Sequence, residues 1–172
     1  MKFETSHTRT RENERVNVAA VSAEEQTRRV REAVARRAYQ IFDTHKGTEP
    51  REKQDWLRAE SEVMRPFCGG RMPINGNVWL GTDPNVFEEG TIELWVAPHQ
   101  LTVCGQPRAG REGVPGGESA SSHAEKIYEV IDLLEEVDPS RVAAEVRGSC
   151  LEVVLGKARH EQEAEQSLKA AA

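Results

Sequence analysis

The glycine-rich segment 105–112 is the part of the chain whose spacing comes nearest to a catalytic motif, that of a phosphate-binding loop. It reads Gly-Gln-Pro-Arg-Ala-Gly-Arg-Glu. A phosphate-binding loop places a Lys-Ser or Lys-Thr pair after its second glycine to contact phosphate and metal, and Arg111-Glu112 stands there instead. The segment also precedes no helical pattern. We interpret it as a connection between elements.

Side chains that bind metals or act as nucleophiles are scattered along the sequence, and no histidine pairs with another histidine or with a cysteine at ligand spacing. These side chains are His7, His45, His99, His123, His160, Cys68, Cys104 and Cys150. The carboxylates Glu135, Glu136 and Asp138 fall in a polar, proline-containing turn. We therefore predict no catalytic residue, no cofactor site and no metal site, and expect that the protein is not an enzyme.

Charge and composition limit the partners. The chain has 172 residues, 37% of them hydrophobic, and a net charge of −6. Residues 1–66 carry 14 basic and 12 acidic side chains, whereas residues 67–172 carry 9 and 17. The acidic second half argues against nucleic-acid binding there. There is no apolar run long enough to span a membrane and no secretory h-region, and the cysteine number is odd, so we expect a cytoplasmic protein.

The first half of the chain predicts a pair of helices. Residues 1–20 are polar and without a period, which indicates a disordered arm. Ser22 and Glu25 form a capping-box pattern ahead of a helical apolar stripe, and Pro66 ends a second such stripe. Residues 21–66 therefore predict a helical hairpin, which has to dock on another surface because two short helices bury little area. Its arginines alternate with glutamates, so an ion-paired face is favoured over a nucleic-acid contact.

The second half changes to a period of two. Residues 67–75 are rich in glycine and proline and indicate a linker. Two alternating runs, 92–97 and 101–105, are joined by a tight turn and predict antiparallel strands. Further strands are predicted within 126–133, 142–146 and 150–155, and residues 106–124 form a long loop. Short strands with no helix between them predict an all-β, immunoglobulin-like antiparallel sandwich over 76–158, followed by a polar tail, 159–172.

Three segments of this region resemble the α-crystallin domain of small heat-shock proteins. They read VWLGTDPNVFEEGTIELWV (78–96), IELWVAPHQLTVCGQ (92–106) and EKIYEVIDLLEEVDPSRVAAEVRGSCLEVVLGKA (125–158). Ser149 and Cys150 stand where the family has Gly-Val, with Gly148 one place earlier to form the turn. The stretch 37–60 resembles a short bacterial helical domain of unknown function. The resemblance implies a sandwich of the α-crystallin type, preceded by the two-helix hairpin.

The resemblance also implies a function. Small heat-shock proteins are ATP-independent chaperones, or holdases, that bind partially unfolded client proteins in stress. The tail lacks the Ile-x-Ile motif that links dimers into large oligomers in this family. A dimer is therefore expected, and a large assembly is not. The alternative is a non-enzymatic adaptor, similar to a co-chaperone, in which the hairpin contacts a dedicated partner.

The family's docking groove lies between the strands 91–97 and 142–146. The apolar residues predicted to form it are Ile92, Leu94, Val96, Val142 and Val146, and the alternative for all five is ordinary sandwich core. Trp95 points to the opposite face of its strand. It is predicted either to be an exposed anchor for a partner or to be covered by the helical hairpin.

Overall fold

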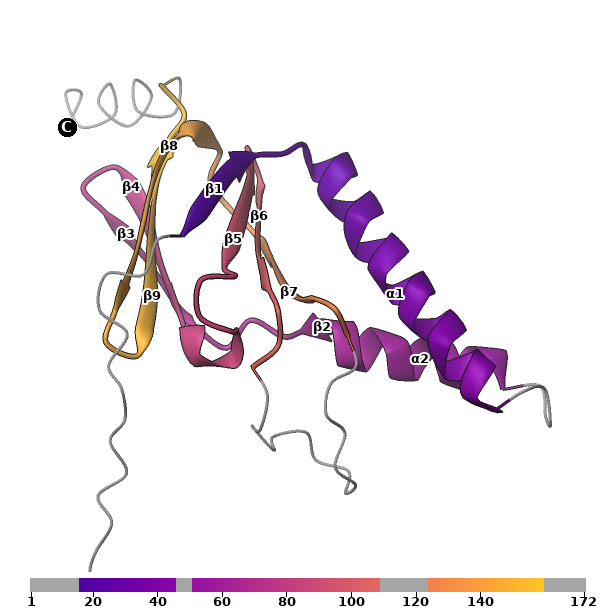
Figure 1. Ribbon diagram of the computed structural model, residues 1–172. Coiled ribbons are helices and arrows are strands. Elements are labelled where there is room, and N and C mark those ends of the chain that lie inside the picture. The colour runs from indigo at the N-terminus through magenta and orange to yellow at the C-terminus, as the bar shows by residue number, and fades with distance from the viewer. Residues whose placement is uncertain (1–15, 46–50, 109–123, 160–172) are drawn as a thin grey trace, which may run out of the picture.

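Two β-sheets and a helical hairpin form three layers in the computed structural model, which describes residues 16–45, 51–108 and 124–159 (Figure 1). Sheet A has the strand order β1-β5-β6-β7-β2, and sheet B has the order β3-β4-β9-β8. Sheet A comprises β1 (Asn17–Ala20), β5 (Glu93–Ala97), β6 (Gln100–Gly105), β7 (Ile127–Asp132) and β2 (Met64–Arg65). Sheet B comprises β3 (Gly70–Ile74), β4 (Asn77–Thr82), β9 (Cys150–Lys157) and β8 (Val137–Arg147). The predicted sandwich with an N-terminal two-helix hairpin is confirmed.

The core lies between the two sheets because each strand alternates. The β5–β6 and β6–β7 pairs are antiparallel and put Leu94, Leu101 and Ile131 on one face of sheet A. The facing side of sheet B carries Leu80 and Val153, which are directly opposite each other in the β4–β9 ladder. All five side chains are buried. Apolar residues at every second position thus fill the space between the layers.

The helical hairpin covers the outer face of sheet A. It consists of α1 (Ala23–His45) and α2 (Glu52–Val63). The predicted cap is present, since the Ser22 hydroxyl accepts a hydrogen bond from the Glu25 backbone N–H at 3.3 Å. Arg37 of α1 donates to Glu62 of α2, and this contact joins the helices. Figure 1 shows that α1 is nearest to the sheet at its N-terminal end and leans away toward its C-terminal end.

Two predicted boundaries need correction. Residues 1–20 were expected to be a disordered arm, yet Asn17–Ala20 forms β1 and pairs in parallel with β5. Residues 67–75 were expected to be a linker, yet Gly70–Ile74 forms β3 and pairs with β4. Both strands are short and lie at sheet edges, where a neighbouring strand supplies the order that the local sequence does not. Residues 1–15 of the expected arm, 109–123 of the long loop and 160–172 of the polar tail lie outside the described residues.

Local turn chemistry follows the sequence more closely. Gly148 begins the turn between β8 and β9 with a φ of +61°, a conformation that residues with a Cβ rarely adopt. Asp83 precedes a short 3-10 helix, Pro84–Val86, and its side chain accepts the Asn85 N–H. β8 begins at Val137, so part of the connection predicted before residue 142 is strand, with an irregular register between Val137 and Val142.

One carboxylate lies among the apolar side chains of the interior. Glu129 on β7 is buried and accepts a 2.8 Å hydrogen bond from the Thr82 hydroxyl on β4. Arg65 on β2 lies opposite Glu129 in the β2–β7 register, with 4.0 Å between the Nε of Arg65 and the Glu129 carboxylate. Burial raises the pKa of Glu129, although the Thr82 hydroxyl and Arg65 oppose this effect. The contact joins the two sheets at one end.

Candidate protein-binding groove

The five predicted groove residues come from two strands that meet at one side of the sandwich. Ile92 immediately precedes β5, which carries Leu94 and Val96, and β8 carries Val142 and Val146. All of them point into the space between the sheets. Four are buried, and Val142 is half-buried. The structure therefore brings the predicted residues together. The sequence left two alternatives for these residues, an open groove and ordinary sandwich core. In the structure they line the interior between the sheets.

The groove is closed by the protein's own β1 strand. β1 lies along the edge of β5 and also contacts β8, as Figure 1 shows. The Asn17 N–H donates to the Ile92 carbonyl at 3.2 Å, and the Val21 N–H donates to the Val96 carbonyl at 3.0 Å. The side chains that pack on the core from this segment are Val16, Ala19 and Val21. The register sets Val18 beside Leu94 and Ala20 beside Val96 on the inner face of sheet A, and Ala19 beside Trp95 on the outer face. The segment therefore occupies the edge of β5 as an added strand.

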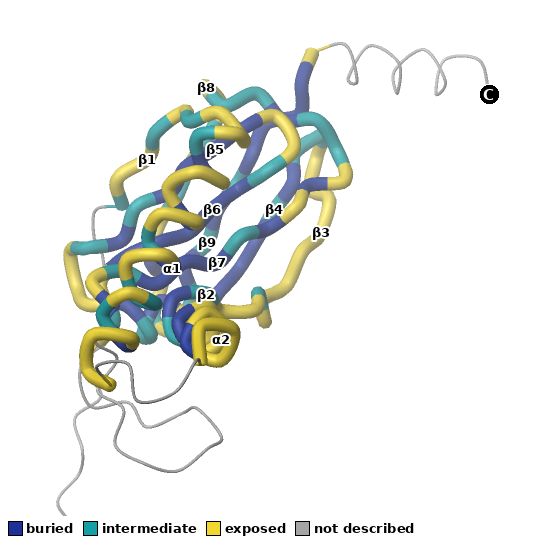
Figure 2. The backbone as a smooth tube through the Cα atoms, turned by 90° about the vertical axis from the view of Figure 1, so that its right-hand side faces the viewer, coloured by how far each residue is buried: buried dark blue, intermediate teal, exposed yellow. Residues whose placement is uncertain are grey.

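β1 is held by few contacts. It has four residues, three of which are exposed, and the side chain of Val18 retains 37% of its accessible surface. Within the described residues no strand pairs with its outer edge. Figure 2 shows β1 with exposed and half-buried segments, whereas β5 beside it is largely buried. A short strand with one paired edge is among the least stable elements of a sheet.

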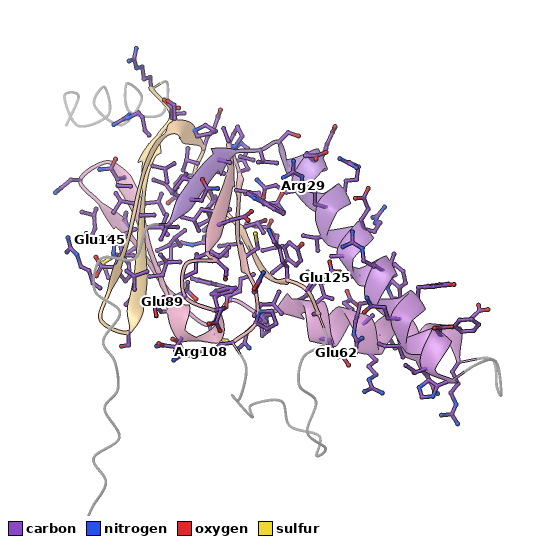
Figure 3. The ribbon with its side chains drawn as sticks, in the orientation of Figure 1. Arg29, Glu62, Glu89, Arg108, Glu125 and Glu145 are labelled. Atoms are coloured by element: carbon purple, nitrogen blue, oxygen red, sulfur yellow. The ribbon has the colours of Figure 1, made fainter. Side chains whose placement is uncertain are left out.

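Trp95 is covered by the helical hairpin, which is the second of its two predicted alternatives, and it is not an exposed anchor. Only 5% of its surface is accessible to solvent. The Arg29 guanidinium of α1 lies over the ring, with 5.0 Å from its Cζ to the ring centroid, and the Tyr128 ring is 5.7 Å away. Figure 3 shows Arg29 on the side of α1 that faces the sheet. The hairpin needs an apolar surface on which to dock, and the outer face of sheet A provides it through Trp95.

A buried polar contact fixes the junction between β1 and α1. The Gln26 side chain is fully buried in the first turn of α1. Its Nε2 donates to the Val21 carbonyl at 2.8 Å, and its Oε1 accepts from the Thr102 hydroxyl on β6 at 2.7 Å. Buried amides and hydroxyls are costly unless paired, so these two bonds specify one position of the helix on the sheet. Sequence periodicity gave no sign of this contact.

Most arginines of α1 form ion pairs within the protein. Arg28 and Arg29 both pair with Glu25. Glu125 pairs with Arg36 across 89 residues of sequence and links the hairpin to the start of β7. These contacts agree with the predicted ion-paired face. They leave less positive charge on this helix for a phosphate backbone.

The hairpin exposes several large apolar side chains. Tyr39 is 70% exposed and Leu57 is 54% exposed. Phe42 and Trp56 are also exposed. Trp56 of α2 further lines a shallow hollow along α1 that contains Ala35 and Arg31. Several large apolar groups on one small helical module are typical of a surface that contacts another molecule.

Metal binding, membrane spanning and thiol chemistry are three further functions that the described side chains could serve. Among the residues that the structure describes, no three His, Cys, Asp or Glu side chains are grouped closely enough to hold a metal ion. None of the described helices is long and apolar enough to cross a membrane. Cys68, Cys104 and Cys150 all carry free thiols, and burial raises the pKa of Cys104 to about 12. Such a thiol is not a nucleophile near neutral pH.

The feature that sequence reasoning missed is the occupant of the groove. The segment 16–21 reads Val-Asn-Val-Ala-Ala-Val, a short apolar run directly before the Ser22 cap. Four residues are too few for a period-two pattern to stand out against the polar sequence before them. The one feature of the sequence that could have indicated this strand is an apolar run that stands alone between a polar segment and the start of a helix.

Comparison with known proteins finds matches among solved structures. No family model and no curated protein matches the chain. Heat shock protein 16.0 from Schizosaccharomyces pombe is similar over 54% of this chain and 87% of its own, with 16% identity and a TM-score of 0.41. HSP18.5 from E. histolytica covers 54% and 88%, with 12% identity and a TM-score of 0.41. The hspA of Xanthomonas axonopodis covers 54% and 94%, with 15% identity and a TM-score of 0.40.

Proposed function

We propose that the protein is an ATP-independent holdase that binds extended, apolar segments of unfolding proteins at the edge of β5. The observation that carries this proposal is β1, a segment bound at that edge as an added strand, with Val18 beside Leu94 and Ala20 beside Val96. A client segment would take the same position after β1 leaves. Strand addition supplies affinity through backbone hydrogen bonds, and pockets for alternate side chains supply selectivity.

The geometry of β1 describes the preferred client. A segment of about six extended residues reaches from the Ile92 carbonyl to the Val96 carbonyl, the two acceptors that β1 uses. Small or β-branched apolar side chains fit, because those of β1 are valine and alanine. The second half of the chain is strongly acidic, so neutral or basic segments are favoured over acidic ones. Binding of this kind requires no cofactor and no nucleophile.

We place this activity in the reducing cytoplasm, during stress, with the protein as a dimer. The support for the compartment is that all three cysteines are free thiols. The support for a small assembly is the sequence of the tail, which has Leu168 as its only large apolar residue after residue 159. Sedimentation of the full chain measures the assembly. Particles of many subunits would contradict this part of the proposal.

Aggregation of a heat-labile test client, followed by light scattering, tests the holdase function. We expect the full chain to suppress aggregation at near-equimolar ratios. A synthetic peptide of residues 16–21 should relieve the suppression because it competes for the β5 edge. The matched control is the same peptide with aspartate in place of Val18 and Ala20, the positions beside Leu94 and Val96. It should have no effect. Aggregation that proceeds unchanged across a broad range of ratios would exclude this function.

An adaptor with a dedicated partner is the second candidate, and the exposed aromatic side chains of the hairpin favour it. Tyr39, Phe42 and Trp56 are accessible on the helices and outside the docking contact with sheet A. Under this alternative, Tyr39→Ser with Phe42→Ser abolishes capture of the partner without changing the suppression of client aggregation. A monodisperse protein that suppresses no aggregation would favour the adaptor over the holdase.

A further inference from the structure

The helical hairpin is bracketed by two strands that close both edges of sheet A. β1 precedes α1 and pairs with β5, and β2 follows α2 and pairs with β7. Both pairings are parallel. Residues 16–45 and 51–65 therefore extend across the outer face of sheet A, from one edge to the other (Figure 1). We call this continuous unit, β1-α1-α2-β2, the strap.

The strap is internally connected where it leaves the groove. Gln26 of α1 binds the Val21 carbonyl, which follows β1 directly, and the same side chain binds Thr102 on the sheet. Arg29, one helical turn further, lies over Trp95. Movement of α1 away from the sheet breaks the Gln26–Thr102 bond while the Gln26–Val21 bond can travel with the strap. The first turn of α1 and the end of β1 thus share one anchor.

The contacts that hold the strap are few relative to those within the sandwich. β1 has four residues and β2 has two, whereas β8 and β9 pair along most of their lengths. The C-terminal part of α1 leans away from the sheet. Elements held by short strand pairings open at lower free energy than the core strands. β1 and β2 give the strap this property.

We infer that the strap leaves and returns to sheet A as one unit, so that docking of the hairpin controls access to the β5 edge. The inference rests on the proposed function for its biological meaning, since it concerns the same binding site. The helices then serve as a gate: β1 occupies the groove while Gln26 and Arg29 hold α1 in place. When α1 is released, β1 leaves the groove and the outer face of sheet A becomes exposed at the same time.

Cys104 provides a reporter of release. It is fully buried and lies opposite Tyr128 in the β6–β7 register, with its side chain on the outer face of sheet A that the hairpin covers. With Cys68→Ser and Cys150→Ser in the full chain, alkylation by a small maleimide reports on Cys104 alone. A docked strap protects this thiol, and a released strap does not. The alkylation rate therefore measures the opening of the helices.

A pair of proline variants tests whether β1 and the helices move together. The N–H groups of Asn17 and Val21 face β5, so that of Ala19 does as well, while that of Val18 faces away. Ala19→Pro removes a hydrogen bond to β5, and Val18→Pro removes none. We expect Ala19→Pro to raise the Cys104 alkylation rate about tenfold and Val18→Pro to leave it within about twofold.

Hydrogen exchange separates release from global unfolding. The β9 amides should exchange equally slowly in both proline variants, because β9 lies in the other sheet. Equal alkylation rates in the two variants, or β9 exchange that rises along with alkylation, would overturn the strap. Either result would mean that β1 moves independently or that the whole domain opens at once.

A binding measurement connects release to the groove. The probe is the peptide of residues 16–21, and the latch variant is Gln26→Ala with Thr102→Val, which removes the bond without leaving a buried hydroxyl. We expect the latch variant to bind the peptide about fivefold more tightly than the natural chain, and the peptide to accelerate Cys104 alkylation in both. Peptide binding with unchanged affinity and unchanged alkylation would overturn the gate and leave the holdase function standing. Absence of peptide binding, with Cys104 still released by Ala19→Pro, would exclude the groove as a binding site and leave the strap standing.

Discussion

Gln26 and Thr102 are 76 residues apart in sequence, and their side chains share a 2.7 Å hydrogen bond with both residues fully buried. Gln26 is in the first turn of α1, and Thr102 is in the middle of β6. The bond sets the position of the hairpin on the sheet because neither group can find water once the layers close. The Gln26 side chain also binds the carbonyl of Val21, the residue that follows the end of β1. The position of α1 therefore sets the position of β1 as well.

A double-mutant cycle should measure this bond. Gln26→Ala should lower the free energy of unfolding by about 1–3 kcal/mol, since it leaves the Thr102 hydroxyl buried without its acceptor. Thr102→Val together with Gln26→Ala should cost less than the sum of the two single changes, with a coupling of roughly 1 kcal/mol. Urea denaturation of the four proteins gives the values. Strict additivity would mean that the bond contributes nothing.

Arg29, whose guanidinium lies over the Trp95 ring, should contribute more to the free energy of unfolding than Arg28 in the same helical turn. Arg28 and Arg29 both pair with Glu25, but only Arg29 lies over the Trp95 ring. Arg29→Ala should lower the free energy of unfolding by about 0.5–2 kcal/mol through the lost cation–π contact. Arg28→Ala, the matched control, should be close to neutral because its ion pairs are exposed. Equal losses in the two variants would contradict a role for the ring contact.

Glu129 should make stability depend on pH in a predictable direction. Burial raises its pKa above the ordinary value of 4.5, so the folded protein holds this proton more tightly than the unfolded chain does. Its contribution is then most favourable below pH 4.5 and is lost as the pH rises through the folded pKa. Glu129→Gln keeps a group that can bond to Thr82 and carries no charge.

We therefore expect Glu129→Gln to be more stable than the natural chain at pH 7, with the difference shrinking as the pH is lowered. Chemical denaturation at a series of pH values measures it. The control is Glu145→Gln, since Glu145 is exposed on β8 and makes its contact with Arg147 in solvent (Figure 3). A difference that stays constant with pH would show that Glu129 titrates equally in the folded and unfolded states.

Gly148 should resist replacement for a backbone reason alone. A Cβ at this position would meet nothing within 4 Å, so any cost comes from its φ of +61°. Gly148→Ala should lower the free energy of unfolding by about 1 kcal/mol, and Gly148→Asn should cost less because asparagine tolerates this region better. Ser149→Ala, in the next turn position, should be close to neutral. Thermal unfolding of the three variants provides the comparison.

The sequence determined the parts of this protein that depend on neighbouring residues. Alternation identified the strands of the sandwich and put Leu94 and Val96 on its inner face. The Ser22 and Glu25 pattern located the start of α1, and Gly148 marked a turn. A period of two or of 3.6 residues is written into adjacent side chains, so it survives without any knowledge of the fold. The placement of the five predicted groove residues beside one another came from the resemblance to the α-crystallin domain, not from their periodicity.

Only the tertiary structure decided what covers each surface. The sequence left Trp95 between an exposed anchor and a covered one, and Arg29 of α1 covers it. It assigned residues 17–20 to a disordered arm, and β5 makes them a strand because an unsatisfied sheet edge lies beside them. These outcomes depend on contacts between segments about 70 residues apart, such as Gln26 and Thr102. Local periodicity carries no information about which distant edge or face a segment will meet.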